Sequence, residues 1–217
     1  MRTVTTRKYL LKDPQSVYKE KCFLFLMKFI DAKTIQMDRT LSELDLFVLQ
    51  FLRILERHTP YVIISGYVSI LLGRSRSTED VDIFIQKISQ EQFEQLYADL
   101  QKYYWCLNGD TLNELYDYLE EGTALRFAKP NTIIPNFEVK LALSPLQQES
   151  FIDTLDVITK QGTFHISSLE RQIAFKRYYL KSEKDLEDAE HIEETFKNNL
   201  DMRKVYAYKQ RIEKSLS

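Results

Sequence analysis

Apolar residues fall into short segments with two different spacings along the chain. From Leu44 to Leu55 they recur every three or four residues, which predicts an amphipathic helix that ends before Pro60. Residues 61–64 form a continuous apolar run and predict a short buried strand. In residues 80–85 polar and apolar positions alternate, as in a strand that buries one face. Helical and extended elements therefore follow one another within the first half of the chain.

The other segments continue this mixture. We expect helices at 67–72, 89–104, 111–121 and beyond 165, strands at 124–127 and 133–143, and a hairpin at 156–166. A Ser or Thr followed three residues later by Glu or Gln is the capping-box pattern, and it predicts helix starts at Thr40, Ser89, Thr111 and Ser167. Turn-forming residues at 31–33 favour a hairpin over 29–37, and a helix over 17–30 is the alternative.

This order of elements predicts a mixed α/β, or α+β, fold that ends in a helical region. We divide the chain into an N-terminal arm or hairpin (1–39), a core (40–164) and a C-terminal helical region (165–217). Residues 1–16 are polar and read as an arm or an edge strand.

Composition narrows the class of protein. Hydrophobic residues make up 44% and charged residues 29% of the 217 residues, which is typical of a globular chain. The net charge of −2 gives no bulk attraction to nucleic acid or membranes. Two cysteines make no disulfide framework, and three scattered histidines make a His-ligated metal site improbable. With no apolar run long enough for a signal or membrane segment, we expect a cytoplasmic protein without a membrane partner.

Two acids in the strand predicted at 80–85 are the first candidates for catalytic and metal-binding residues. Residues two apart in a strand point to the same face, so Asp80 and Asp82 present their carboxylates side by side. A hard divalent ion such as Mg²⁺ would relieve their repulsion and would also bind substrate phosphates. The alternative is an edge strand with two solvated acids.

A candidate anion site precedes these acids. Ser65 and Gly66 lie between a strand and a short helix, where backbone N–H groups can face a phosphate. Arg74, Arg76 and Thr78 follow in a polar loop that connects this turn to the acids, and we expect them to bind the nucleotide together with the turn. The alternative for the loop is a solvated surface segment.

These residues resemble the signature of the polymerase-β-like nucleotidyltransferases, and most closely their AbiEii-type and minimal branches. The branch core is Arg-x-Thr-x-Asp-hydrophobic-Asp, and Arg76, Thr78, Asp80 and Asp82 match it. Ser65 replaces the first glycine of the usual pair. The resemblance covers roughly residues 61–192 and implies a small mixed sheet flanked by helices, an NTP donor, and Mg²⁺ or Mn²⁺ as cofactor.

The resemblance also implies a third acid on a later strand. Glu138 stands at such a place and would be a metal ligand or the general base. Lys140 shares its face by the period of two, so a plain salt bridge between the two is the alternative.

The same branch carries a lysine and paired acids in the helices after the core. Here Lys176 or Lys184 would reach the triphosphate, with Asp185 and Asp188 holding the lysine in place. The alternative is an exposed helix with surface ion pairs.

The resemblance implies a metal-dependent nucleotidyltransferase that moves an NMP from an NTP to a hydroxyl of a tRNA, a protein or a small molecule. A toxin-like role, as in toxin–antitoxin pairs, is part of this expectation. A non-catalytic nucleotide-binding or interaction protein that retains the fold is the alternative. The sequence selects neither the acceptor nor an oligomeric state.

Overall fold

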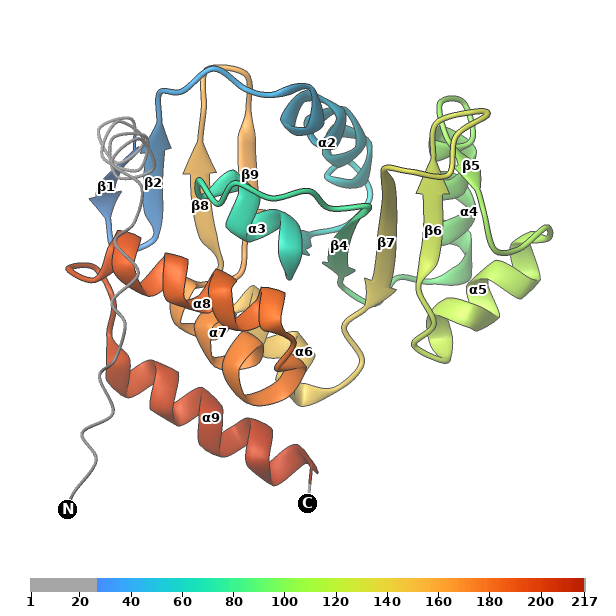
Figure 1. Cartoon of the computed structure of the whole chain (residues 1–217). Helices are drawn as coiled ribbons and strands as arrows, with labels where there is room; N and C mark the ends of the chain where they lie inside the picture. The colour runs from blue at the N-terminus through green and yellow to red at the C-terminus, as the bar shows by residue number, and fades with distance from the viewer. Residues whose placement is uncertain (1–26, 217) are drawn as a thin grey trace, which may run out of the picture.

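A computed structural model describes residues 27–216 of the protein. Nine strands of this part form one sheet in the order β1-β2-β8-β9-β3-β4-β7-β6-β5 (Figure 1). Three neighbouring pairs, β2–β8, β3–β9 and β4–β7, are parallel, and the others are antiparallel. The strands are β1 (Met27–Asp31), β2 (Thr34–Met37), β3 (Tyr61–Ile63), β4 (Asp80–Ile85), β5 (Trp105–Cys106), β6 (Leu125–Ala128), β7 (Asn136–Leu141), β8 (Leu155–Ile158) and β9 (Thr163–Ile166).

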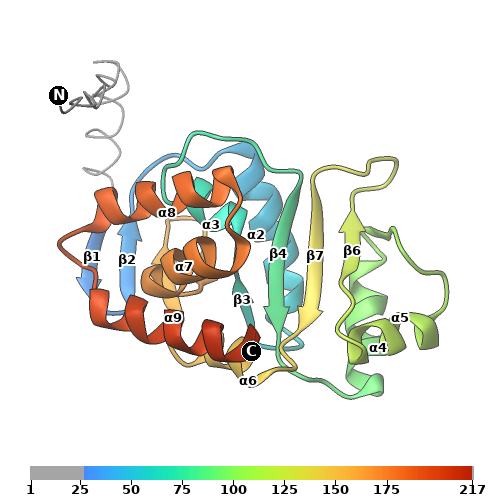
Figure 2. The same cartoon turned by 60° about the horizontal axis from the view of Figure 1, so that its bottom comes forward.

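Helices lie on both faces of this sheet. They are α2 (Glu43–Leu55), α3 (Gly66–Leu71), α4 (Gln90–Leu100), α5 (Leu112–Glu120), α6 (Pro145–Gln148), α7 (Leu169–Phe175), α8 (Glu183–Phe196) and α9 (Met202–Leu216). A π-helical turn, η2 (Lys176–Leu180), continues α7, and a 3₁₀ turn, η1 (Glu149–Phe151), follows α6. Figure 2 shows α7, α8 and α9 gathered over the β1–β3 part of the sheet, with β4, β7 and β6 beside them.

The opposite face of the sheet carries α2 and α4. Phe51 of α2 stacks on Phe137 of β7 with 3.8 Å between ring centroids, and both rings are fully buried. Val81 and Ile83 of β4 are also fully buried. Because side chains alternate along a strand, the polar residues between them are directed to the other face, where α3 and α7 lie.

The fold-class prediction is confirmed: the described residues form a mixed α/β structure with a mixed sheet and a helical C-terminal region. The hairpin at 29–37 is also confirmed, and residues 27–30 belong to a strand instead of the alternative helix. Residues 1–26, which include most of the predicted arm and Cys22, lie outside the described part. In the described part no helix has the length and apolar character needed to span a membrane.

The start of the first long helix differs from the sequence prediction. The N-cap of α2 is Ser42 instead of Thr40, because Asp45 closes the capping box with it. The Ser42 N–H donates to Asp45 Oδ2 at 2.7 Å, and Ser42 Oγ accepts from the Asp45 N–H at 3.2 Å. Arg39 and Tyr67 also bind the Asp45 carboxylate, at 2.6 and 2.8 Å. Tertiary partners thus fix this carboxylate and, with it, the first residue of the helix.

Candidate active site

The register between β4 and β7 brings two predicted site acids together. The strands are parallel, with Asp82 opposite Glu138 and Asp80 opposite Asn136. Asp80 and Asp82 share a face of β4, and Glu138 stands on the same face of the neighbouring strand. Thr78 donates to the Asp80 backbone carbonyl at 3.0 Å and to Asp80 Oδ1 at 3.3 Å, which ties the end of the loop to the start of β4.

Two cationic side chains contact these acids. Lys140 Nζ lies 3.3 Å from Asp82 Oδ1 and 3.1 Å from Glu138 Oε2. Arg126, opposite Glu138 on β6, donates to Glu138 Oε1 at 2.5 Å. The ion pair between Glu138 and Lys140 is therefore present, and it extends to Asp82.

Asp82 and Glu138 differ in the direction of their pKa shifts. Burial raises the pKa of the Asp82 carboxyl; the charge of Lys140 opposes this, and those of Asp80 and Glu138 reinforce it. Burial also acts to raise the pKa of Glu138, but hydrogen bonds and charges from Lys140 and Arg126 outweigh it and hold this pKa below its usual value. Of Asp82 and Glu138, Asp82 is thus the acid whose charge is less compensated by its neighbours.

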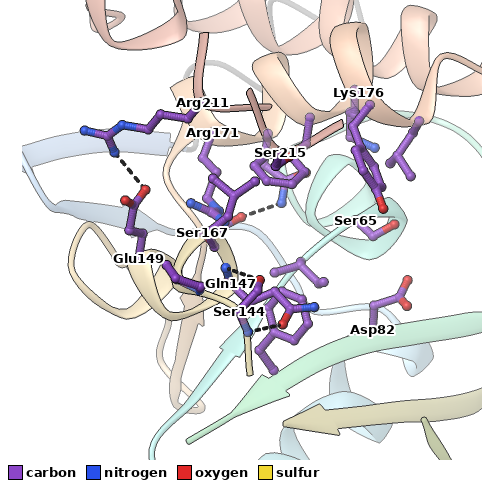
Figure 3. A pocket seen from close by; sticks show the side chains of 18 of the residues that line it. Ser65, Asp82, Ser144, Gln147, Glu149, Ser167, Arg171, Lys176, Arg211 and Ser215 are labelled. Carbon is purple, nitrogen blue, oxygen red and sulfur yellow. Dashed lines mark hydrogen bonds and ion pairs between the residues drawn. The ribbon is translucent and has the colours of Figure 1, made fainter. Parts of the chain in front are cut away.

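A cavity of about 960 Å³ opens beside these strands. Asp82 and Lys140 line it together with Ser65 and Lys176, whereas Asp80 and Glu138 are not among the lining residues. Figure 3 shows Asp82, Ser65 and Lys176 on one side of the cavity and Arg171, Arg211 and Glu149 on the other. Its walls come from the β3–α3 turn, β4, β7, α6, α7, η2 and α9, so residues far apart in the chain complete it.

The turn at the start of α3 has an unusual backbone. Ser65 has φ 64° and ψ −137°, a conformation that glycine adopts more readily than other residues. The next residue, Gly66, lies directly under a guanidinium: a Cβ added there would be 2.1 Å from Arg76 Nη2. Gly66 therefore allows Arg76 to pack against the turn.

A buried acid on α8 connects this arginine to the C-terminal helices. Asp188 is fully buried, and Lys176 Nζ lies 2.8 Å from its Oδ2. Arg76 and Arg74 approach the same carboxylate at 3.3 and 3.6 Å. Asp185 Oδ1 lies 3.6 Å from Lys176 Nζ. The predicted loop and the predicted tail thus meet at one ionic cluster.

The two candidate lysines of the C-terminal helical region lie in different environments. Lys176 is fully buried, pairs with Asp188 and lines the cavity, whereas Lys184 lies on the exposed side of α8 and outside the cavity lining. The side chains of Thr78 and Arg76 lie beside Gly66 in the turn. Arg74 pairs with Glu187 of α8.

Some cavity residues had no signal in the sequence. Arg171 of α7 is only 3% exposed, donates to the Leu146 carbonyl, and lies 4.6 Å from the centre of the Phe175 ring. Arg211 of α9 pairs with Glu149 at 2.7 Å. An arginine on the buried face of a helix is the one feature that could have marked Arg171, because a buried cation needs a polar neighbour.

Asp80 and Asp82 are a pair of carboxylates with the chemistry to hold a hard cation. Among residues 27–216 no three Asp, Glu, His or Cys side chains converge as a metal-binding group. Asp80 and Asp82 remain as a pair on one strand, and Mg²⁺ is commonly held by one or two carboxylates together with substrate phosphates.

Comparisons with known proteins identify the fold. No family model and no curated protein matches the chain. The solution structure of the antibiotic-resistance factor ANT(2'')-Ia is similar at 15% identity and a TM-score of 0.52, over 79% of this chain and 91% of that chain. A nucleotidyltransferase-like protein from Paracoccidioides brasiliensis gives 16% identity and a TM-score of 0.45, over 66% of this chain and 72% of that chain. JHP933 from Helicobacter pylori gives 17% identity and a TM-score of 0.42, over 76% of this chain and 72% of that chain. The chain therefore has a nucleotidyltransferase-type fold.

Proposed function

We propose that the chain is a metal-dependent nucleotidyltransferase that moves an NMP from an NTP to an acceptor hydroxyl and releases pyrophosphate. The observation that carries this proposal is the cavity, in which the half-buried Asp82, the β3–α3 turn, Lys140 and Lys176 face one space in a nucleotidyltransferase-type fold. The volume of about 960 Å³ is at the upper end for small-molecule sites and has room for a nucleotide and part of an acceptor.

Asp80 and Asp82 would hold Mg²⁺ or Mn²⁺ in this proposal. The ion, when bound, neutralises phosphate charge and makes the α-phosphorus a better electrophile. Ser65 and Gly66 would present backbone N–H groups to the outer phosphates, and Lys176 would add positive charge beside them. Arg74, Arg76 and Asp188 hold Lys176 and the turn in place through the ionic cluster.

The reaction forms a bond from the acceptor oxygen to the α-phosphorus and breaks the bond from that phosphorus to the leaving pyrophosphate oxygen. The electron pair departs with pyrophosphate, and the hydroxyl proton passes to water. The protein mainly positions the reactants and compensates charge.

Finer assignments within this proposal rest on the sequence motif. The AbiEii-type branch and a toxin-like role are proposed from residues 61–84 and the motif in the C-terminal helices, and a cytoplasmic location from the composition and the lack of a signal segment. A tRNA end, a protein hydroxyl and a small molecule all remain candidate acceptors.

The test is transfer of label from each α-labelled NTP, with Mg²⁺ or Mn²⁺, to bulk tRNA, to a protein extract or to a small-molecule extract. We expect one NTP to label one acceptor class with the wild type, and no labelling with Asp82→Asn. Lys87→Met is the matched control, since Lys87 pairs with Glu120 at 2.8 Å outside the cavity. Metal-dependent NTP binding without transfer to any acceptor would identify the non-catalytic alternative.

A further inference from the structure

We propose that Lys140 is a catalytic residue of this site, a built-in cation that takes the place of a second metal ion, and that Glu138 positions Lys140 instead of binding metal. The inference rests on the proposed function and names a further residue of the same reaction. It assigns to Glu138 a role other than the third metal ligand or the general base.

The position of the ammonium is the first observation. The β4–β7 register sets Asp82 beside Glu138, and Lys140 follows Glu138 by two residues on the same face. Its Nζ bridges Asp82 Oδ1 and Glu138 Oε2 at 3.3 and 3.1 Å. One ammonium thus lies between two carboxylates of neighbouring strands, where a second ion would otherwise be expected to lie.

The direction in which each group faces is the second observation. The Lys140 side chain is 30% exposed and lines the cavity, whereas the Glu138 side chain is 11% exposed and does not. A substrate in the cavity therefore meets the ammonium and Asp82, with Glu138 behind the ammonium.

The balance of charges among the acids and the cationic side chains is the third observation. Both Glu138 oxygens are engaged, one with Arg126 and one with Lys140. Three carboxylates against two cationic side chains leave one uncompensated negative charge, which one divalent ion on Asp80 and Asp82 is sufficient to offset. A second ion would have to displace Lys140 from both acids.

The chemistry of transfer needs a cation at this place. As the acceptor oxygen attacks, negative charge is distributed over the oxygens around the α-phosphorus. An ammonium already held between Asp82 and Glu138 can donate hydrogen bonds to those oxygens without reorganisation, and this is the condition under which charge stabilisation is most effective.

The test combines Mn²⁺ titration, by calorimetry or electron paramagnetic resonance, with transfer rates. Lys140→Met should bind Mn²⁺ more tightly than the wild type without nucleotide, because a competing cation beside Asp82 is gone. It should transfer roughly a hundredfold more slowly, as expected for loss of one preorganised donor. Lys140→Arg keeps the charge and should recover part of the rate. Lys87→Met removes a lysine–carboxylate pair elsewhere and should change neither quantity.

Glu138→Gln separates positioning from metal binding. As the anchor of Lys140, it should slow transfer without weakening Mn²⁺ binding, and the Glu138→Gln/Lys140→Met double variant should be no slower than Lys140→Met alone. Weaker Mn²⁺ binding in Glu138→Gln, or a normal transfer rate in Lys140→Met, would overturn the inference and leave the proposed function standing. Absence of transfer by the wild type, with Mn²⁺–NTP bound, would overturn the proposed function itself.

Discussion

Replacing Asp188 should destabilise the protein more than replacing the lysine that pairs with it. Asp188 is fully buried and is shared by Lys176, Arg76 and Arg74. Asp188→Asn keeps the shape of the side chain and removes its charge. Lys176 then retains only Asp185, at 3.6 Å, and Arg76 has no carboxylate within 4.0 Å among the described residues.

The loss in the free energy of unfolding depends on which charges stay buried without a partner in each variant. Removing one member of a buried ion pair costs about 3–5 kcal/mol, because the other charge stays desolvated. Asp188→Asn should fall in this range. Lys176→Met removes the buried ammonium itself and leaves Asp188 with two arginines, so we expect a smaller loss, about 1–3 kcal/mol.

Urea unfolding followed by far-ultraviolet circular dichroism measures both free energies. Lys184→Ala is the matched control on α8, and we expect it to stay within about 0.5 kcal/mol of the wild type because Lys184 is exposed. A loss below about 1 kcal/mol in Asp188→Asn, or a larger loss in Lys176→Met than in Asp188→Asn, would refute the shared-acid interpretation.

Three further predictions test other parts of the site. Gly66→Ala should displace Arg76 and lower the free energy of unfolding by about 1–2 kcal/mol, and this effect should nearly vanish in an Arg76→Ala background. Ser42→Ala should cost about 1 kcal/mol in urea unfolding, whereas Thr40→Ala should cost almost nothing if Ser42 is the cap. Burial raises the pKa of Asp82, so its ionisation destabilises the folded state as pH rises from the ordinary value of 3.8 through the raised one. Asp82→Asn should therefore raise the melting temperature at neutral pH and leave it unchanged at pH values below 3.8, and equal shifts at both would contradict this sign.

Local signals in the sequence were sufficient for most elements and for the two aspartates of β4. The alternation of Asp80, Val81 and Asp82 fixed which side chains face the core, and Val81 is fully buried as expected. The cap of α2 was assigned two residues early, because the partners of Asp45 come from elsewhere in the fold and leave no local pattern.

Contacts between distant segments were beyond the reach of periodicity. The pair of Lys140 with Glu138 lies within one strand and could be anticipated, whereas its contact with Asp82 depends on the register of two strands 56 residues apart. The sequence likewise left open which of Lys176 and Lys184 faces the cavity. The π-helical turn and the left-handed residue Lys181, with φ 62°, break the helix and change the phase between Lys176 and Lys184.

The strand order has a consequence for synthesis on the ribosome. The hairpin of β8 and β9 lies between β2 and β3, although both of these strands precede it by about a hundred residues in the chain. A nascent chain that has emerged only as far as β7 therefore has two strands with unpaired edges, each of them completed only when residues 155–166 appear. Premature termination before residue 155 should yield chains that associate through these edges, and chaperone demand should be greatest during this interval of translation.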